Sequence, residues 1–355
     1  MLSGNRGEWS EVYTLFKLLA EGKLYAGDAN LNLLKDVYYP ILSIIREESN
    51  RKNEYQIHNG NIKILINGNE EISIPKSRFL TEANKLFLTI KSNKSSFQIP
   101  ELDVLLHSMG CSSLRAASTS KSDIFISLYD ERLSHTVNLG FSIKSQLGSD
   151  STLLNAGKST NFIYEVSNVD DTILKINEID TRSKIKDRIS KLLELNAGLK
   201  FYSMENKVFM NNLTLIDSRL PEIISELLLM FFRGLASEIK ILADHLIEKN
   251  PLEFDLEHSH NYYEYKIKRL LTESALGMTP AKVWNGEYDA TGGYLVVKED
   301  GEIVCYHIYN RNQFEDYLFQ NTKLDTASSG RNDFGTIFKE NNKFYLKLNL
   351  QIRFK

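Results

Sequence analysis

The chain has little cysteine and no long hydrophobic run, and these absences exclude several classes of protein. Of its 355 residues only Cys111 and Cys305 are cysteines, which are too few for a disulfide framework or a thiolate metal site. The longest apolar run is the six residues Leu227–Phe232, whereas a membrane-spanning helix needs about 20. The first residues also lack the apolar run of a signal peptide. We therefore expect a cytoplasmic protein without a membrane anchor.

An excess of basic charge is also lacking. The formal net charge is −3, and the hydrophobic content of 42% and charged content of 25% are ordinary for a globular protein. DNA-binding proteins use lysine and arginine to contact phosphates, so the bulk composition does not favour DNA binding. The charge is uneven, however, because residues 321–355 contain seven basic and three acidic side chains. A local basic surface is therefore compatible with the composition.

Hydrophobic periodicity and turn signals predict a mixture of helices and strands. The Asn-Gly pairs at 59–60 and 67–68 are typical of hairpin turns between strands. The pattern favours an α/β (α+β) fold with a mixed β-sheet flanked by helices. Helices are predicted over 3–22, 31–48 with an interruption at Pro40, 76–92, 99–109, most of 170–250, and 313–319; strands are predicted over 55–74, 124–128, 136–145, 163–166, the hairpin after 292, and the hairpin from 334 to 354.

The most informative pattern is an acid before one predicted strand and a lysine within the next. Asp123 follows Lys121-Ser122, and Lys144 lies 21 residues further along the chain in Phe141–Gln146. A carboxylate is a suitable ligand for a hard divalent cation, and a lysine can orient an attacking water and offset charge on a phosphate. Neighbouring strands lie about 4.8 Å apart. This arrangement is the skeleton of a metal-dependent phosphodiesterase site of the PD-(D/E)XK type.

The pattern departs from that motif two residues before the lysine. Ser142 stands where the motif usually has an acid, and a serine cannot replace a charged ligand. Side chains alternate along a strand, so Ser142, Lys144 and Gln146 share one face. Such a polar row is costly on a central strand unless it faces a site. The alternative is an edge strand whose polar row lies in water.

The first predicted helix offers two acids that could supply the missing carboxylate. Glu8 lies along the edge of the apolar stripe of that helix, and Glu11 lies slightly further round its circumference. Acids in the first turn also stabilise a helix through its dipole. Both a metal-binding role and a structural role therefore remain open for these residues.

Segments at both ends of the chain resemble the HpaII-type restriction endonucleases. These segments are Gly4–Glu11, Ala290–Tyr294, Asn310–Phe314 and Leu348–Phe354. The resemblance extends from Gly4 to Phe354. It implies a type II restriction endonuclease that hydrolyses double-stranded DNA with Mg2+ at a short CCGG-type palindrome, alongside a cognate methyltransferase that acts on the same site.

The resemblance also implies roles for individual residues. Asp123 and Glu8 would bind Mg2+, with Glu11 as the alternative to Glu8. Lys144 would position or help to deprotonate the attacking water, and Gln146 would orient water or phosphate. A palindromic target favours a homodimer, since a two-fold site matches a two-fold protein.

DNA contacts are predicted in two further segments. Arg331 and Ser329 lie in the polar segment 326–333, and an arginine can bind a guanine edge through two hydrogen bonds. Lys158, Ser149 and Ser151 follow the lysine strand and are expected to contact phosphates, which fix position without reading sequence. The alternative for the first segment is an ordinary hairpin loop.

A change in the sequence pattern after Pro251 predicts a domain boundary near residue 250. The predicted domains are a nuclease core over 1–250 and a DNA-recognition region over 251–355. Ser142 and the acidic net charge keep a second interpretation open, a non-catalytic DNA-binding protein on a degenerate nuclease fold. A third interpretation is an α/β protein with no role in nucleic-acid binding.

Overall fold

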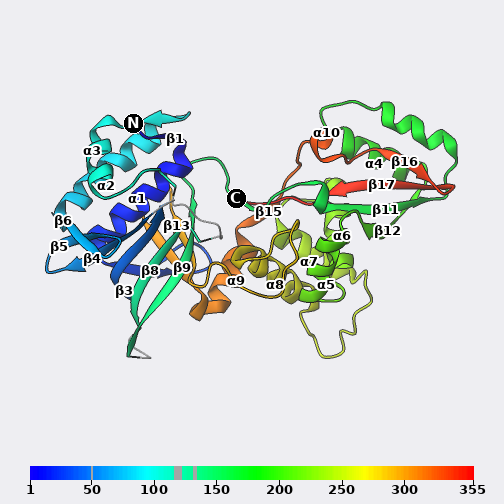
Figure 1. Cartoon of the computed structure of the whole chain (residues 1–355). Helices are drawn as coiled ribbons and strands as arrows, with labels where there is room; N and C mark the ends of the chain where they lie inside the picture. Colours follow the sequence, from blue (N-terminus) through cyan, green and yellow to red (C-terminus); the bar gives the residue numbers. More distant parts are fainter. Residues whose placement is uncertain (49–50, 116–121, 131–133) are drawn as a thin grey trace. The chain divides into compact units, whose positions relative to one another are not determined.

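A computed structural model describes residues 1–48, 51–115, 122–130 and 134–355 of the chain (Figure 1). Lys121, which precedes Ser122 and Asp123 in the sequence pattern, lies outside the described residues. The fold is a mixture of α-helices and β-sheets, as the sequence predicts. Within the described parts of the chain, no helix is both long and apolar enough to cross a membrane.

The chain forms two compact units, each built from two segments. Unit 1 contains residues 1–151 and 288–317, and unit 2 contains residues 152–287 and 318–355. These divisions differ from the single boundary near residue 250 that the sequence predicts. Residues 288–317, which were assigned to the recognition region, instead complete the sheet of unit 1.

Unit 1 consists of a large sheet, a small two-stranded sheet and the helices that pack against them. Its strands are β1 (Ser3–Gly4), β2 (Lys23–Gly27), β3 (Leu33–Glu48), β4 (Arg51–His58), β5 (Asn61–Ile66), β6 (Asn69–Pro75), β7 (Phe97–Gln98), β8 (Ile124–Asp130), β9 (His135–Ser145), β13 (Gly293–Val297) and β14 (Ile303–His307). Its helices are α1 (Arg6–Glu21), α2 (Lys76–Ser92), α3 (Pro100–Ser108), the 3₁₀ turn η3 (Ile308–Asn310) and α9 (Arg311–Gln320), whose last residues belong to unit 2.

The large sheet has nine strands in the order β2-β14-β13-β9-β8-β3-β4-β5-β6. Strand β13 runs parallel to β9, and β14 runs parallel to β2, whereas the remaining pairs are antiparallel. Strand β9 therefore lies between β8 and β13 and is not an edge strand. The predicted strands at 124–128 and 136–145 are confirmed as β8 and β9, and the predicted hairpin after residue 292 is confirmed as β13 and β14.

The helix predicted over 31–48 is wrong, because this segment is the long strand β3. Its sequence from Val37 to Ile45 is rich in aromatic and β-branched side chains, which favour strands. Pro40 is strongly unfavourable inside a helix and here pairs with Lys23 of β2. The first part of β3 pairs with β2, and its later part pairs with β4 and β8. Long-range pairing therefore decides the structure of this segment.

Helix α1 matches the helix predicted near the N-terminus and is central to the core of unit 1. Asn5 caps its start, and Gly22 ends it in the left-handed conformation with a φ of 71°. Trp9, Val12 and Phe16 are fully buried in a cluster that includes α2 and one face of the sheet. Burial of each such large side chain contributes about 1.5–3 kcal/mol, so this stripe holds the helix in place.

The predicted meander over 55–74 is confirmed as strands β4, β5 and β6. At the first turn Asn59 and Gly60 have φ values of 45° and 81°, and at the second Asn67 and Gly68 have values of 50° and 86°. Two consecutive positive φ values characterise the turn that fits the twist of a hairpin. Local turn chemistry therefore identified these strands from sequence.

Unit 2 contains two smaller sheets and a group of helices. Its strands are β10 (Thr152–Leu154), β11 (Asn161–Ser167), β12 (Gly198–Met204), β15 (Thr322–Leu324), β16 (Ile337–Glu340), β17 (Lys343–Asn349) and β18 (Ile352–Phe354). Its helices are η1 (Lys158–Thr160), η2 (Asp171–Glu178), α4 (Lys184–Glu194), α5 (Lys207–Ile216), α6 (Leu220–Phe232), α7 (Ile239–Lys249), α8 (Tyr262–Leu276) and α10 (Ser329–Asn332).

An antiparallel sheet in the order β12-β11-β17-β16 organises unit 2. Tyr164 of β11 is fully buried and donates a hydrogen bond from its hydroxyl to the carbonyl of Ser225 in α6, over 2.8 Å. Within the region 170–250 that was predicted to be mostly helical, α6 and α7 are separate helices, and Gly234 adopts a φ of 85° after α6. Strand β12 interrupts the region that was predicted to be mostly helical.

Candidate active site

Asp123 lies directly before β8, where several backbone and side-chain groups fix it. Its N–H donates to the carbonyl of Phe141 over 2.8 Å. Its Oδ2 accepts hydrogen bonds from the Ser142 hydroxyl over 3.1 Å and from the N–H of Ile143 over 2.7 Å. No described residue donates to Oδ1. The carboxylate is therefore held by one oxygen while the other is available to a ligand.

Lys144 lies on the same face of β9 as Ser142, as the alternation predicts. The neighbouring strand β13 places Tyr294 opposite Ser142 and Val296 opposite Lys144. The Lys144 ammonium lies 5.2 Å from the centre of the Tyr294 ring. Burial lowers the pKa of Lys144 below its ordinary value, and the negative charges of Asp123 and Glu11 oppose that lowering. An ammonium in this environment releases its proton more readily than that of an exposed lysine.

Glu11 on α1 is the helix acid that interacts with both of these groups. Burial, followed by the negative charge of Asp123, raises its pKa from 4.5 to about 8, while Arg46 and Arg115 act in the opposite direction. Only 17% of its side chain is exposed. Asp123, Lys144 and Glu11 therefore form one electrostatically coupled cluster.

Glu8 has a different structural position from Glu11. Its carboxylate accepts a hydrogen bond from the N–H of Asn5 over 2.8 Å, and its own N–H donates to the side chain of Asn5 over 3.1 Å. This reciprocal pair is a capping box, which satisfies free N–H groups at the start of a helix. The structure therefore favours Glu11 over Glu8 as the partner of Asp123. The capping signal, an Asn followed by a Glu three residues later, is visible in the sequence.

Two arginines that sequence analysis did not select lie close to these carboxylates. Arg115 places its Nε 3.4 Å from Glu8 and 3.8 Å from Glu11. Arg46 is 4% exposed and pairs with Glu48 over 2.9 Å. Because the segment containing Arg46 was predicted to be a helix, the electrostatic effect of Arg46 on Glu11 could not be anticipated.

The segment from Ala290 to Tyr294 supports the strand that bears Lys144. Gly292 donates its N–H to the carbonyl of Gly140 over 2.7 Å, and Gly140 donates its N–H to the Thr291 hydroxyl over 3.2 Å. A Cβ atom on Gly292 would lie 2.6 Å from the ring of Phe141. A glycine is therefore required for the close approach of this segment to β9.

The remaining predicted site residues lie at several places in the two units. In unit 1, the N–H of Gln146 donates to the carbonyl of Val297 over 2.9 Å just after β9, and Ser149 and Ser151 follow it. In unit 2, Lys158 begins η1 and is exposed. Ser329 and Arg331 lie in α10, so the predicted loop contains a short helix.

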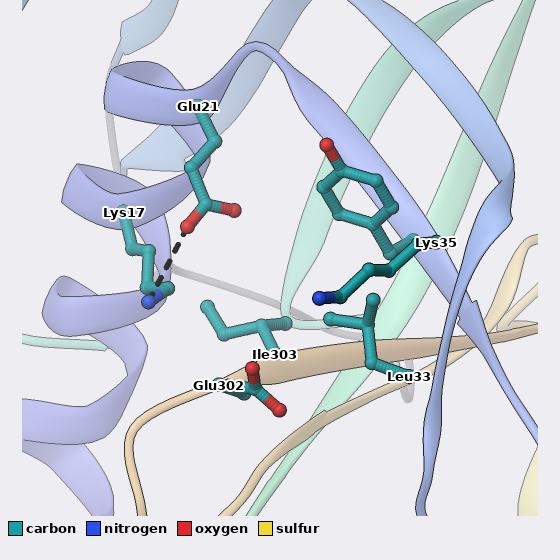
Figure 2. Close-up of a pocket in the computed structure, with 7 residues that line it drawn as sticks. Lys17, Glu21, Leu33, Lys35, Glu302 and Ile303 are labelled. Atoms are coloured by element: carbon teal, nitrogen blue, oxygen red, sulfur yellow. Dashed lines mark ion pairs between the residues drawn. The ribbon is translucent and has the colours of Figure 1, made fainter.

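A separate pocket of unit 1 contains none of the predicted site residues. It has a volume of about 290 Å³ and lies at the C-terminal end of α1 (Figure 2). Lys17 and Lys35 line it together with Glu21 and Glu302. Figure 2 shows the ion pair between Lys17 and Glu21, which spans 3.3 Å. Its charged lining is balanced in sign, so the pocket has no preference for an anion.

The donors of the Asp123 cluster fit a hard divalent cation. Asp123 and Glu11 provide carboxylate oxygens, the ligand type that Mg2+ prefers. Their mutual repulsion contributes to the raised pKa of Glu11, and a cation between them would offset it. Groups of three or more His, Cys, Asp or Glu side chains suited to a metal are absent from the described residues. The fit therefore rests on two carboxylates, with water or substrate oxygen completing the coordination.

Comparisons with known proteins give a family match and a relative that each span nearly the whole chain. Residues 5–354 match the HpaII restriction endonuclease family. This chain belongs to the HpaII restriction endonuclease family. The type II restriction enzyme HpaII of Haemophilus parainfluenzae is 50% identical to it over 355 residues, covering 99% of this chain and 98% of that protein. No solved structure gives a significant match.

Membership in the HpaII restriction endonuclease family confirms the resemblance found in the sequence. It places the chain among the type II restriction enzymes, which are site-specific deoxyribonucleases. The interpretation without any role in nucleic-acid chemistry is thereby excluded. The match spans both units, so both belong to the matched part of the chain.

Proposed function

We propose that this chain is a restriction endonuclease that uses Mg2+ to hydrolyse double-stranded DNA at a short CCGG-type palindrome. The observation that carries the proposal is the coupled cluster of Asp123, Lys144 and Glu11 on a central strand and the helix beside it. An acid before one strand, a lysine on the next and an acid from the first helix are the parts of a PD-(D/E)XK core. We assign unit 1 to that core.

Asp123 and Glu11 would hold the Mg2+ ion. When bound, the ion supplies a Lewis acid for the phosphate and lowers the pKa of a coordinated water. Ser142 and the N–H of Ile143 orient the Asp123 carboxylate through hydrogen bonds to Oδ2. Its other oxygen, Oδ1, would then bind the ion. Glu8 stabilises the start of α1 and assists only through the position of the helix.

Lys144 acts on the attacking water and the scissile phosphate. The lowered pKa of its ammonium makes proton exchange with water easier, while its charged form offsets negative charge on the phosphate. The ring of Tyr294, 5.2 Å from the ammonium, fills the space beside it. Gln146 orients water or phosphate at the end of the same strand.

The proposed target and assembly extend the family assignment. Arg331 and Ser329 would contact base edges, whereas Lys158, Ser149 and Ser151 would contact phosphates. A palindromic target favours a homodimer. A cognate methyltransferase would modify the same sequence in the same cytoplasm.

Ser142 bears on the alternative of a non-catalytic DNA-binding protein. That alternative treats the serine as a lost metal ligand. The hydrogen bond from Ser142 to Asp123 instead gives it a positioning role, which supports catalysis. The favoured function is therefore cleavage.

Plasmid digestion with and without Mg2+ tests the proposal. Wild type should give discrete bands that map to CCGG, and Asp123→Asn and Lys144→Met should give none while still binding a CCGG duplex in Ca2+. Lys191→Met, on the exposed side of α4, serves as a control for loss of a lysine. DNA binding without cleavage by wild type, over several DNAs and divalent metals, would favour the non-catalytic alternative.

A further inference from the structure

A cavity of about 460 Å³ is formed entirely by residues of unit 2. The start of α4 lines one part of it, and the segment leading into α10 lines another. Arg182, Lys184 and Lys186 are its charged lining residues, and no acid lines it. It differs in this respect from the pocket of unit 1, where two lysines face two glutamates.

Two of the three cations have no compensating carboxylate. Lys184 is paired with Asp180 over 2.8 Å. Arg182 and Lys186 are exposed, and within the described chain neither forms an ion pair with an acid. Lys186 places its ammonium 5.7 Å from the centre of the Phe231 ring. The cavity therefore has an uncompensated positive charge and favours an anion.

Hydroxyl groups supply further donors around the cavity. Ser183 and Ser328 occupy the positions before α4 and α10, where a serine commonly caps the helix, yet neither makes a capping hydrogen bond. Thr326 and Ser329 also line the cavity. Hydroxyls and cations together are the donor set that binds phosphate oxygens.

We propose that this cavity binds a backbone phosphate of the DNA substrate. The inference rests on the proposed function and adds a contact region, residues 182–186 and 326–329, to it. Ser329 lines the cavity, and Arg331 lies two residues further along the same short helix. A phosphate bound here would fix the register of the segment that carries Arg331. Phosphate contacts position a protein on DNA, and base contacts then specify the sequence.

A polymeric phosphodiester suits the cavity better than free phosphate. Its two uncompensated cations, Arg182 and Lys186, are exposed at the surface of unit 2. The phosphodiester backbone of a DNA strand can therefore reach them. A local group of uncompensated cations is also compatible with DNA binding by a chain of net charge −3.

The double variant R182A/K186A tests the inference against the matched control K191A/K240A. The control removes the same charge from two lysines of unit 2 that are exposed and paired with Glu194 and Asp244. Binding of the full chain to a CCGG duplex and to a duplex without CCGG is measured in Ca2+ over a range of salt concentrations. Thermal unfolding with inorganic phosphate alone provides a third measurement.

Loss of a phosphate contact should affect both duplexes alike. R182A/K186A is expected to weaken binding to each duplex about tenfold at moderate salt, and to reduce the slope of log affinity against log salt by about two. The control should match wild type. Inorganic phosphate at millimolar concentration should not change the unfolding temperature.

Three results would overturn the inference and leave the proposed function standing. In each, wild type binds DNA normally. In the first, R182A/K186A binds both duplexes as the control does. In the second, R182A/K186A loses binding to the CCGG duplex alone, which indicates base readout. In the third, R182A/K186A keeps its DNA binding, and inorganic phosphate raises the unfolding temperature of wild type but not of the variant. If wild type itself binds neither duplex, the proposed function fails first.

Discussion

The hydroxyl of Ser142 donates a hydrogen bond to Asp123 Oδ2 over 3.1 Å. Ser142 is 3% exposed and occupies the position at which the PD-(D/E)XK motif usually has an acid. A second carboxylate at this distance would repel the first in a site with little water. Within this chain, the serine therefore complements Asp123, and Glu11 of α1 is the acid that is electrostatically coupled to it.

Ser142→Ala should weaken the use of Mg2+ without preventing DNA binding. The N–H of Ile143 still donates to Asp123 over 2.7 Å, so the carboxylate loses one of two contacts on that oxygen. Loss of a residue that orients a metal ligand typically costs 10–100-fold, and we expect about tenfold in cleavage rate at limiting Mg2+. A Mg2+ titration of cleavage beside binding in Ca2+ measures both effects. Unchanged Mg2+ dependence would assign the serine a purely structural role.

Glu11→Gln and Glu8→Gln should have opposite outcomes, although each removes one acid beside Arg115. Glutamine can maintain a capping box, so Glu8→Gln should cut DNA at close to the wild-type rate. Glu11→Gln removes the carboxylate that is coupled to Asp123 and Lys144, and cleavage should fall by at least about a hundredfold. The sequence alone favoured the reverse order. Equal loss in both variants would indicate that the two acids act together.

Strands with local signals were predicted correctly from the sequence. Asp123 and Lys144 were placed on adjacent strands because alternating apolar residues identify β8 and β9, and the spacing between them allows one hairpin. The polar row starting at Ser142 was interpreted as facing a site, and β9 is indeed a central strand.

Features that depend on distant parts of the chain were missed. Tyr294 reaches the site because β13 pairs in parallel with β9 from about 150 residues away in sequence, and local patterns contain no information about that pairing. Arg46 was missed because β3 was predicted to be a helix, although Pro40 and the β-branched and aromatic residues around it favour a strand. The choice between Glu8 and Glu11 could have been made from the sequence, because the capping signal at Asn5 gives Glu8 a structural role.

Arg331→Ala should reduce discrimination between cognate and non-cognate duplexes. Arg331 is exposed in α10, so its removal should leave the fold intact. An arginine that binds a guanine edge contributes about 1–3 kcal/mol of discrimination, which corresponds to roughly tenfold to a hundredfold in relative affinity. Competition between CCGG and non-CCGG duplexes in Ca2+ measures this ratio. An equal loss for both duplexes would make Arg331 a phosphate contact instead.

Glu11 should destabilise the metal-free protein as the pH rises. Its pKa is about 8 in the folded chain, against an ordinary value of 4.5. Between these values the folded state binds more protons than the unfolded state, so the free energy of unfolding decreases as pH increases. Relative to acid pH, the raised pKa lowers the free energy of unfolding by about 3 kcal/mol at pH 7.

Thermal unfolding of wild type and Glu11→Gln in EDTA from pH 5 to pH 8.5 measures this cost. Glutamine cannot ionise, so the variant should unfold at a higher temperature than wild type, with a small difference near pH 5 that grows until about pH 8. Addition of Mg2+ should stabilise wild type more than the variant, because the ion offsets the charge that destabilises the site. Parallel pH profiles for the two proteins would show that Glu11 ionises freely, and would remove the electrostatic argument for a cation between Glu11 and Asp123. The same comparison therefore tests the metal site without depending on cleavage.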